Sequence, residues 1–374
     1  MPRVALVHDW LTGMRGGEKV LLSLASLFPE APIYTLLHVK GSVAPEIEAH
    51  QIRTSFLQRF PAVETRYRHY LPLFPAAAAW LDLRDFDLVI SSSHCVVKGV
   101  KVRKGALHLC YCHTPMRYVW DRYPDYFGPG RLSWPATWMV PRVAKRLRAW
   151  DVATAPRVHR FAANSAYVAA RIRRYYHREA EVIPPPVDTD FFTPGAGGPG
   201  DYDLVISALE PYKRIELVLE AYRGTGLPLR VVGTGTQEAR LRALAPPEAR
   251  FLGKVDDETL RDLYRGCRAV IMPGIEDFGI VPLEAMACGR PAVVFAEGGG
   301  PESTTHGETG LLFQEPTPAS LRAVIGDLRN CRFDTMTLRR RAEGSSRPAF
   351  EARLRGFVER AWADRGPGVV QPTW

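Results

Sequence analysis

The sequence has 374 residues, more than one hydrophobic core usually accommodates, and its length favours two domains. Its composition, 46% apolar and 24% charged, is typical of a globular enzyme, and no apolar run is long enough to span a bilayer. The net charge of +9 comes from the first half: residues 1–190 hold 26 Lys and Arg against 16 Asp and Glu, and residues 191–374 hold 23 against 24. A basic first half predicts an anionic neighbour. Since the sequence contains no compact nucleic-acid-binding motif, a membrane surface ranks ahead of nucleic acid.

Cysteine usage and the start of the chain indicate the compartment. Six cysteines are scattered along the sequence, and although Cys110, Cys112 and His113 have spacing that suits zinc, no second ligand pair follows. We therefore expect buried free thiols and no metal site. The chain enters a strand at residues 3–7 without a signal-peptide pattern, so we expect a cytoplasmic protein.

The first half has the pattern of a doubly wound α/β domain. Strands are predicted at residues 3–7, 32–36, 86–93, 106–112 and 161–165. A glycine loop with Gly16 and Gly17 follows the first strand and leads into a predicted helix at residues 18–27. Ligands bind at the carboxyl ends of the strands in such sheets. His113 directly follows a strand and is a candidate site residue, although a structural histidine fits the pattern equally well.

Residues 117–150 combine aromatic and basic side chains. The segment contains Trp134, Trp138, Trp150, Arg142, Lys145, Arg146 and Arg148. Tryptophans beside arginines on an amphipathic helix suit a membrane interface. The alternative is a helix that packs on the core and keeps its basic side in solvent, and the pattern favours this alternative slightly.

The α/β pattern restarts after a triple proline at residues 184–186, which can continue neither a helix nor a ladder and predicts a linker. Further strands are predicted at residues 204–207, 229–233, 251–253, 269–272 and 292–295, and helices at residues 215–222, 258–264, 283–288 and 349–363. The turn Gly233-Thr234-Gly235 resembles the start of a dinucleotide fingerprint. Glu238 stands at the third glycine position, which argues against an NAD-dependent oxidoreductase.

The stretch from Glu276 to Glu284 predicts an anion site. It follows a buried strand, contains a glycine turn, and places Pro282 at the expected first position of a helix, with Glu284 in the first turn. Free N–H groups at such a helix start can hold a phosphate. A second glycine loop, residues 298–302, is placed to contact the same ligand. The alternative is an ordinary βαβ unit with solvated carboxylates.

Taken together, these features resemble the GT-B-fold retaining glycosyltransferases of family 4, over nearly the whole chain. The motifs that carry the resemblance are Gly16-Gly17-Glu18, His113-Thr114-Pro115-Met116-Arg117-Tyr118, Asn164-Ser165, Pro185-Pro186-Val187-Asp188, Lys213, the pair Glu276 and Glu284, and the late glycine loop with Glu302. Within the family, the sequence is most similar to bacterial enzymes that build polysaccharides or lipopolysaccharide-type glycans, many of them mannosyltransferases.

For the second half, the resemblance implies a binding site for a nucleotide-diphosphate sugar. Glu276 would bind hydroxyls of the transferred sugar, Glu284 would hold the ribose, and Lys213 would act on the diphosphate. Backbone N–H groups would bind the diphosphate and the sugar, and the residues implied are Phe278, Gly279, Ile280 and Val281. Glu302 in the late glycine loop would contact the same donor. The resemblance implies catalytic roles for Glu276, Lys213 and His113.

For the first half, the resemblance implies that Gly16 and Gly17 let the backbone approach the phosphate closely and that His113 contacts the sugar near the reacting carbon. One position departs from the family pattern. Ala208 stands where the family usually has an arginine that pairs with the diphosphate, and Arg214 is a candidate substitute. This departure bears on the strength of phosphate binding.

The resemblance further implies an α/β protein of GT-B fold, with two Rossmann-like doubly wound domains facing across a cleft. The expected boundaries are an acceptor-side domain at residues 1–187, a donor domain at 188–345, a helix at 346–364 that crosses back to the first domain, and a loose tail at 365–374. The implied activity is metal-independent transfer of a hexose, with mannose favoured. Retention in the family is usually described as attack from the face that the diphosphate leaves.

The expected donor is a nucleotide sugar, GDP-mannose before a UDP-sugar, and no separate cofactor is required. The expected acceptor is a glycan or a polyprenyl-diphosphate-linked glycan of cell-surface polysaccharide biosynthesis. The basic first domain would bind the anionic inner leaflet as a peripheral membrane protein. The alternative is a nucleotide-sugar-binding protein of the same fold with impaired catalysis, for which Ala208 is the sequence hint.

Overall fold

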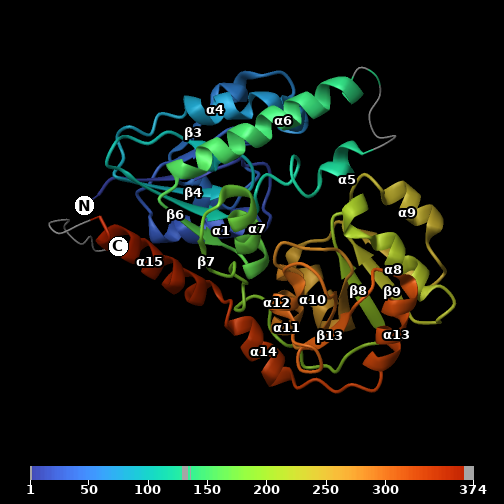
Figure 1. Cartoon of the computed structure of the whole chain (residues 1–374). Helices are drawn as coiled ribbons and strands as arrows, with labels where there is room; N and C mark the ends of the chain where they lie inside the picture. Colours follow the sequence, from blue (N-terminus) through green and yellow to red (C-terminus); the bar gives the residue numbers. More distant parts are fainter. Residues whose placement is uncertain (1, 129–133, 135, 366–374) are drawn as a thin grey trace. The chain divides into compact units, whose positions relative to one another are not determined.

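The protein is described by a computed structural model that covers residues 2–128, 134 and 136–365 (Figure 1). The chain divides into two compact units, one formed by Met1–Pro186 with Phe350–Trp374 and the other by Val187–Ala349. The boundary between the two units thus falls directly after the triple proline at residues 184–186. The tail expected at residues 365–374 lies, from residue 366 on, outside the described residues.

The first unit is built on a parallel sheet. Its strands are β1 (Val4–His8), β2 (Ile33–Thr35), β3 (Ile52–Thr54), β4 (Leu88–Ser93), β5 (Leu107–Cys112), β6 (Arg160–Ala163) and β7 (Ala180–Val182). Their order across the sheet is β3-β2-β1-β4-β5-β6-β7. The order reverses direction between β1 and β4, whose register pairs His8 with Ser92. This is a doubly wound sheet with its switch point between these two strands.

Helices cover both faces of the first sheet. They are α1 (Gly16–Leu27), α2 (Pro45–Glu48), α3 (Val63–Arg66), α4 (Phe74–Trp80), α5 (Tyr123–Phe127), α6 (Ala136–Thr154), α7 (Ala166–Tyr176) and α15 (Arg347–Ala363), with 3₁₀ turns η1 (Phe56–Arg59), η2 (Tyr67–Leu73), η3 (Val97–Gly99) and η4 (Ala155–Arg157). Side chains of β1 alternate between two cores, because successive residues of a strand point to opposite faces. Ala5 and Val7 pack with α4 and α6, whereas Leu6 packs with α1 and α15.

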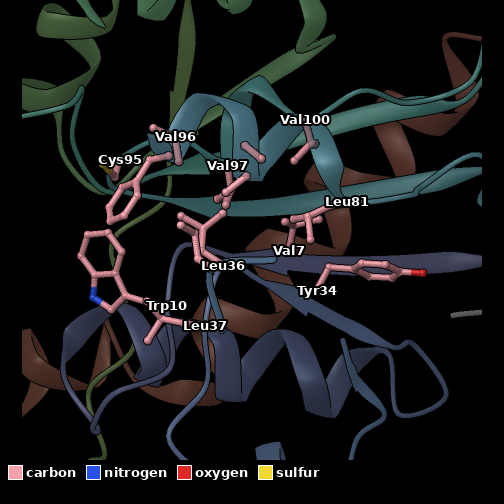
Figure 2. Packing of buried hydrophobic residues seen from close by; sticks show 14 of the residues in the cluster. Val7, Trp10, Tyr34, Leu36, Leu37, Leu81, Cys95, Val96, Val97 and Val100 are labelled. Atoms are coloured by element: carbon pink, nitrogen blue, oxygen red, sulfur yellow. The ribbon is translucent and has the colours of Figure 1, made fainter. Parts of the chain in front are cut away.

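Figure 2 shows part of the core between the first sheet and the layer that contains α4 and α6. Leu36 after β2 and Val97 from η3 lie close together there, Val7 from β1 lies beside Leu81, and the indole of Trp10 lies beside Leu37. On the opposite face, α15 buries an apolar stripe against the sheet. Figure 1 shows this helix on the side of the first sheet away from α6. The stripe consists of Phe350, Leu354, Phe357, Val358, Ala361 and Trp362. The last helix of the described chain is therefore part of the core of the first unit.

The second unit has the same architecture. Its strands are β8 (Tyr202–Ile206), β9 (Leu229–Val232), β10 (Ala249–Gly253), β11 (Cys267–Met272), β12 (Ala292–Phe295) and β13 (Gly310–Phe313), in the order β10-β9-β8-β11-β12-β13. All are parallel, and the switch point lies between β8 and β11. The surrounding elements are η5 (Pro211–Lys213), α8 (Ile215–Tyr222), α9 (Glu238–Leu244), α10 (Asp257–Gly266), α11 (Ile280–Ala287), α12 (Gly300–Ser303), α13 (Pro318–Leu328) and α14 (Thr335–Glu343). The expectation of two Rossmann-like α/β domains is confirmed.

One sequence-based expectation needs correction. Helix α11 begins at Ile280, so Pro282 is its third residue and Glu284 its fifth, two residues deeper than expected. Gly279 has φ +109° and acts as the N-cap, which lets the chain enter the helix early. Proline is tolerated at the third position because the first N–H groups of a helix have no intrahelical acceptor.

Trp150 belongs to the segment for which the sequence left two alternatives open, a membrane interface and a helix that packs on the core. Trp134 and Trp138 are 85% and 62% exposed. Trp150 instead packs against the core of the first unit, and its indole touches Gly99 so closely that a Cβ there would lie 2.5 Å from the ring. Within residues 2–128, 134 and 136–365, no helix is long and apolar enough to cross a membrane.

Candidate functional sites in the two units

Each unit gathers polar side chains at the carboxyl edge of its sheet, next to the point where the strand order reverses. In the first unit these side chains follow β1, β4 and β5. In the second they follow β8 and β11. Parallel strands leave a crevice at this point, because the loops on either side diverge to opposite faces. The two groups are described separately.

In the first unit, Ser92 joins two histidines. The Ser92 hydroxyl oxygen lies 3.1 Å from Nδ1 of His8 and 2.8 Å from Nε2 of His113. His8 and Ser92 are fully buried, and His113 is partly buried at the end of β5. The parallel pairing of β1 with β4 and of β4 with β5 brings the three side chains together.

Glu18, in the first turn of α1, faces the same group. Its Oε1 lies 3.8 Å from Nε2 of His8, and its Oε2 accepts a hydrogen bond of 3.0 Å from the Arg15 N–H in a capping box. Burial alone would raise the pKa of Glu18, but the His8 imidazole, together with His94 and the backbone N–H of Glu18 itself, outweighs burial, and the pKa is lowered. Glu18 is therefore a carboxylate at neutral pH.

Gly17 lets α1 begin against these rings. A Cβ at Gly17 would lie 3.3 Å from Cε1 of His8 and 3.8 Å from Nε2 of His113. The structure thus brings Gly17 and His113 together, as the sequence predicted for this half. Gly16 is the first residue of α1 and is partly buried.

The carboxylate of Asp9 organises the loop that follows β4. It accepts four backbone hydrogen bonds of 2.7–3.1 Å, from the N–H groups of residues 94–97. Burial and the nearby His8 lower the pKa of His94 to about 3, so this ring is neutral at pH 7. The Asn164 amide donates a 3.0 Å bond to the carbonyl oxygen of His113, which fixes the backbone at that residue.

In the second unit, the ammonium group of Lys213 pairs with the carboxylate of Glu276. Lys213 ends η5 after β8, and Glu276 lies in the loop after β11, so the pair sits at the switch point. Their side chains are 18% and 23% exposed, and ligands can therefore reach them. Gly274 permits the approach, since a Cβ there would lie 3.3 Å from the Cα of Lys213.

The loop of Glu276 is held by the second glycine loop. The Gly299 N–H donates a 2.7 Å bond to the carbonyl oxygen of Glu276, and Glu276 forms a parallel bridge with Gly298. A Cβ at Gly298 would lie 2.7 Å from that carbonyl oxygen. The two loops expected to contact one ligand are thus adjacent, through backbone contacts that a larger residue would prevent.

The start of α11 lies beside this pair of loops. Gly279 is buried in a left-handed conformation, where a Cβ would lie 3.2 Å from both Cε of Met272 and Oγ of Ser303. Phe278 is buried, and the side chains of Ile280 and Val281 are partly buried. The early N–H groups of this eight-residue helix provide the positive end that the sequence predicted.

Other residues predicted to bind the nucleotide sugar contact side chains within the second unit. Glu284 is buried, and its Oε2 accepts a 2.7 Å hydrogen bond from the Tyr264 hydroxyl. The carbonyl oxygen of Glu302 accepts a hydrogen bond from Arg341. The guanidinium of Arg214 lies 5.1 Å from the centre of the Phe295 ring. Ala208 is exposed after β8.

Several residues of the first group were not selected from the sequence, namely His8, Asp9, Ser92 and His94. A signal was present, because the predicted strands at residues 3–7 and 86–93 end in His-Asp and in serines. Among the described residues, no group of three or more His, Cys, Asp or Glu side chains is placed to hold a metal ion. Cys110 and Cys112 are buried in an apolar cluster.

The sequence matches two family models. Residues 14–191 match the model described as Glycosyltransferase Family 4, and residues 188–344 match the model described as Glycosyl transferases group 1. The boundary between the matches falls close to the division between the two units.

Curated relatives match over part of their length. The D-rhamnosyltransferase WbpZ of Pseudomonas aeruginosa is 32% identical over 157 residues, which cover 40% of this chain and 41% of the relative. The D-inositol 3-phosphate glycosyltransferase of Geodermatophilus obscurus is 34% identical over 199 residues, 44% of each chain. The chain thus spans less than half the length of the curated relatives it matches.

Solved structures match over almost the whole chain. The Anabaena protein Alr3699/HepE in complex with UDP-glucose aligns with a TM-score of 0.68 and 17% identity, covering 96% of this chain and 99% of that one. Sucrose-phosphate synthase from Thermosynechococcus elongatus aligns with a TM-score of 0.68 and 18% identity, covering 97% and 100%. At these identities the likeness establishes the fold.

Proposed function

The chain belongs to the group 1, family 4 glycosyltransferases of GT-B fold, and from this premise we propose that it transfers a hexose from a nucleotide-diphosphate sugar to a glycan or lipid-linked glycan. The proposed transfer retains the anomeric configuration and serves the synthesis of cell-surface polysaccharide. Mannose is the favoured sugar and GDP-mannose the favoured donor, with a UDP-sugar as the second choice. The Anabaena structure contains UDP-glucose, which supports a nucleotide-sugar donor as the class.

The observation that carries the proposal is the pairing of Lys213 with Glu276 at the switch point of the second sheet, beside the start of α11. The pair keeps a cation and a carboxylate ready in a partly exposed position, and the early amides of α11 add fixed dipoles. A nucleotide-diphosphate sugar offers partners for each, because its diphosphate is anionic and its sugar carries hydroxyl donors.

The proposed chemistry follows from the charges of the reaction. Breaking the anomeric bond leaves negative charge on the diphosphate and positive charge on the sugar ring. Lys213 and the N–H groups at residues 278–281 stabilise the negative charge that develops on the diphosphate. The carboxylate of Glu276 orients sugar hydroxyls near the positive charge on the ring. Lys213 is released from Glu276 towards the phosphate as the donor binds. The leaving phosphate then takes the proton of the acceptor hydroxyl.

The remaining assignments follow the family resemblance. Glu284 is assigned to the ribose, and its hydrogen bond with Tyr264 holds its carboxylate in one orientation. Glu302 is assigned to the donor through the second glycine loop. In the first unit, His113 is assigned to the transferred sugar, with Gly16 and Gly17 keeping the start of α1 free of side chains.

We also propose that the acceptor side works at an anionic membrane surface. The exposed side of α6 supports this: Trp138 and Met139 are 62% and 52% exposed, and the Arg142 guanidinium lies 3.8 Å from the centre of the Trp138 ring. Lys145 and Arg146 are exposed on the same helix. Tryptophan and arginine together suit the headgroup region of an anionic bilayer.

A thermal-shift panel of GDP-, UDP- and ADP-sugars tests the donor class. A true donor present at a hundred times its Kd raises the free energy of unfolding by about 2.7 kcal/mol through mass action. Glu276→Ala should then lower turnover of that donor by about a hundredfold or more, because it removes a group that acts on the reacting sugar. The exposed Glu308→Ala is the control. Normal turnover by Glu276→Ala would refute the assignment, and binding without turnover of any donor by the unaltered protein would refute the enzymatic role.

A further inference from the structure

Glu18, His8, Ser92 and His113 form a line of polar side chains from the start of α1 across three strands, in which the Ser92 hydroxyl is within hydrogen-bond distance of both histidines and Glu18 faces His8. We propose that Glu18, His8 and Ser92 are positioning residues that determine which ring nitrogen of His113 carries its proton. The inference rests on the proposed function, in which His113 contacts the transferred sugar. It assigns a role to three buried polar residues that the donor chemistry alone does not use.

Glu18 determines the proton of His8. A carboxylate is an acceptor only, and the pKa of Glu18 is lowered in spite of burial because His8 is nearby. Oε1 of Glu18 faces Nε2 of His8 at 3.8 Å, and within the described residues that buried nitrogen has no hydrogen-bond partner. If Nε2 of His8 carried no hydrogen, its lone pair would face a lone pair of the Glu18 carboxylate in a buried site, and the two would repel. His8 therefore carries a hydrogen on Nε2.

The remaining contacts follow from this first proton. When the His8 ring is neutral, its Nδ1 is an acceptor, so the Ser92 hydroxyl donates its hydrogen to Nδ1 of His8. The Ser92 oxygen then accepts a hydrogen bond from Nε2 of His113. His113 is consequently the Nε2–H tautomer, and its Nδ1 is an acceptor.

The other charged groups around His8 do not replace Glu18. The groups that face it or act on its neighbours are Asp9 directly after β1, His94 after β4, His113 after β5, and Arg15 and Arg117 through their charges on His94. The Asp9 carboxylate is occupied by four backbone N–H groups. His94, whose ring centre lies 5.7 Å from that of His8, is neutral because burial lowers its pKa to about 3.

Histidine-ring ¹⁵N NMR tests the proton pattern without any substrate. At a pH where both rings are neutral, the unaltered protein should show His113 protonated on Nε2. Ser92→Ala should give a mixture of the two tautomers. Ser91→Ala is the matched control, since Ser91 is equally buried on the same strand but its hydroxyl lies 2.9 Å from Nε2 of His108. A His113 that is Nδ1–H in the unaltered protein, or unchanged in Ser92→Ala, would overturn the inference.

Kinetics test whether the residues act through His113. Ser92→Ala should lower kcat/KM for the donor about tenfold, and in a His113→Ala background the same change should have no further effect, since coupled residues are not additive. Full additivity would mean that Ser92 acts elsewhere. Glu18→Gln should likewise lower kcat/KM and have no further effect in the His113→Ala background, and Glu18→Asp should restore part of the loss. A loss from Glu18→Gln that persists in full without His113 would also contradict the proposal.

The outcomes of the two experiments distinguish a wrong proposed function from a wrong positioning role. If no nucleotide sugar is bound or transferred, the proposed function is wrong, and the NMR experiment still decides the proton pattern. If transfer occurs but the tautomer of His113 does not depend on Ser92, the function stands and the positioning role is refuted. Because Glu18→Gln keeps the shape of the side chain, it tests the charge even if the serine variant is poorly folded.

Discussion

The ammonium nitrogen of Lys98 lies 3.0 Å from the Asp151 carboxylate in the core of the first unit, where both side chains are almost completely inaccessible to solvent. The same nitrogen donates hydrogen bonds of 2.6 and 3.0 Å to the Asp151 carbonyl oxygen and to Thr154. The carboxylate also accepts from the Trp120 indole at 2.8 Å and the Tyr176 hydroxyl at 2.9 Å. This network ties the end of α6 to η3 and α7.

Lys98→Met should therefore destabilise the first unit strongly. It removes one partner of a buried ion pair and leaves the Asp151 charge without compensation, which typically costs about 3–5 kcal/mol. Denaturant unfolding measures the loss. The exposed pair of Arg84 and Asp82 is the control, since their side chains are 81% and 61% exposed and Arg84→Ala should leave the midpoint unchanged. Equal effects of the two substitutions would contradict the burial argument.

Gly279→Ala should weaken donor binding and stability together. Its φ of +109° and the close approach of Met272 and Ser303 leave no place for a methyl group, and strain of this kind costs about 1–3 kcal/mol. Gly326→Ala is the opposite case. It lies in α13 with open space around it, so alanine should stabilise that helix by about 0.5–1 kcal/mol. Thermal unfolding with and without the donor distinguishes the two, and a neutral Gly279→Ala would be unexpected.

Gly17→Ala should lower activity more than stability. The added methyl group would lie 3.3 Å from the His8 ring, so α1 or the ring must shift by a few tenths of an ångström. We expect kcat/KM to fall about tenfold or more, because small displacements of positioning residues have large kinetic effects. Steady-state kinetics with the donor measure this. Gly198→Ala, where the surroundings are open and φ is not positive, should keep normal kinetics.

Stability should fall as the pH drops below about 6.5. Burial lowers the pKa of His108 from 6.5 to about 3, so between these values the unfolded chain binds a proton that the folded chain does not. Stability is then fully present above the unfolded pKa and lost on acidification, by about 2 kcal/mol at pH 5 for one such group. His94 contributes in the same direction. Urea unfolding between pH 8 and 5 should show a smaller loss of unfolding free energy in His108→Gln than in the unaltered protein. An identical loss in both would show that His108 does not cause the pH dependence.

The exposed face of α6 should mediate binding to anionic vesicles. Trp138→Ala, and separately Arg142→Ala, should reduce sedimentation with phosphatidylglycerol-containing vesicles, and added salt should do the same. The control is Met336→Ala, since Met336 is an equally exposed apolar side chain in the second unit. Equal sedimentation of all three variants, or no sedimentation of the unaltered protein, would remove the membrane part of the proposal.

Long apolar strands and strongly periodic helices were predictable from the sequence. Helix α8 and strand β12 have the predicted bounds, because each is a distinct apolar run between turn residues. Strands β3 and β13 were missed, since three or four residues such as Ile52–Thr54 have too little pattern to distinguish a strand from a loop. Their positions depend on tertiary pairing at the sheet edges.

The candidate site was predictable only where a residue directly follows a strand. His113 was selected in this way and Glu276 from the loop that follows a strand, whereas Lys213 was selected through the family resemblance. Ser92 and His8 were not, although both are close to strand ends, because their contact depends on a parallel register between strands 84 residues apart. The depth of Glu284 in α11 was misjudged since the sequence does not show that Gly279 adopts a positive φ.

The position of α15 affects how the protein is made. The second unit is continuous in sequence, so it can complete its core as soon as Val187–Ala349 have left the ribosome. The first unit is synthesised earlier but must keep an apolar face open until Phe350, Leu354 and Phe357 arrive. Throughout synthesis of the second unit, the nascent first unit should thus be the part that engages chaperones, and a stop codon before residue 350 should turn it into an aggregating fragment.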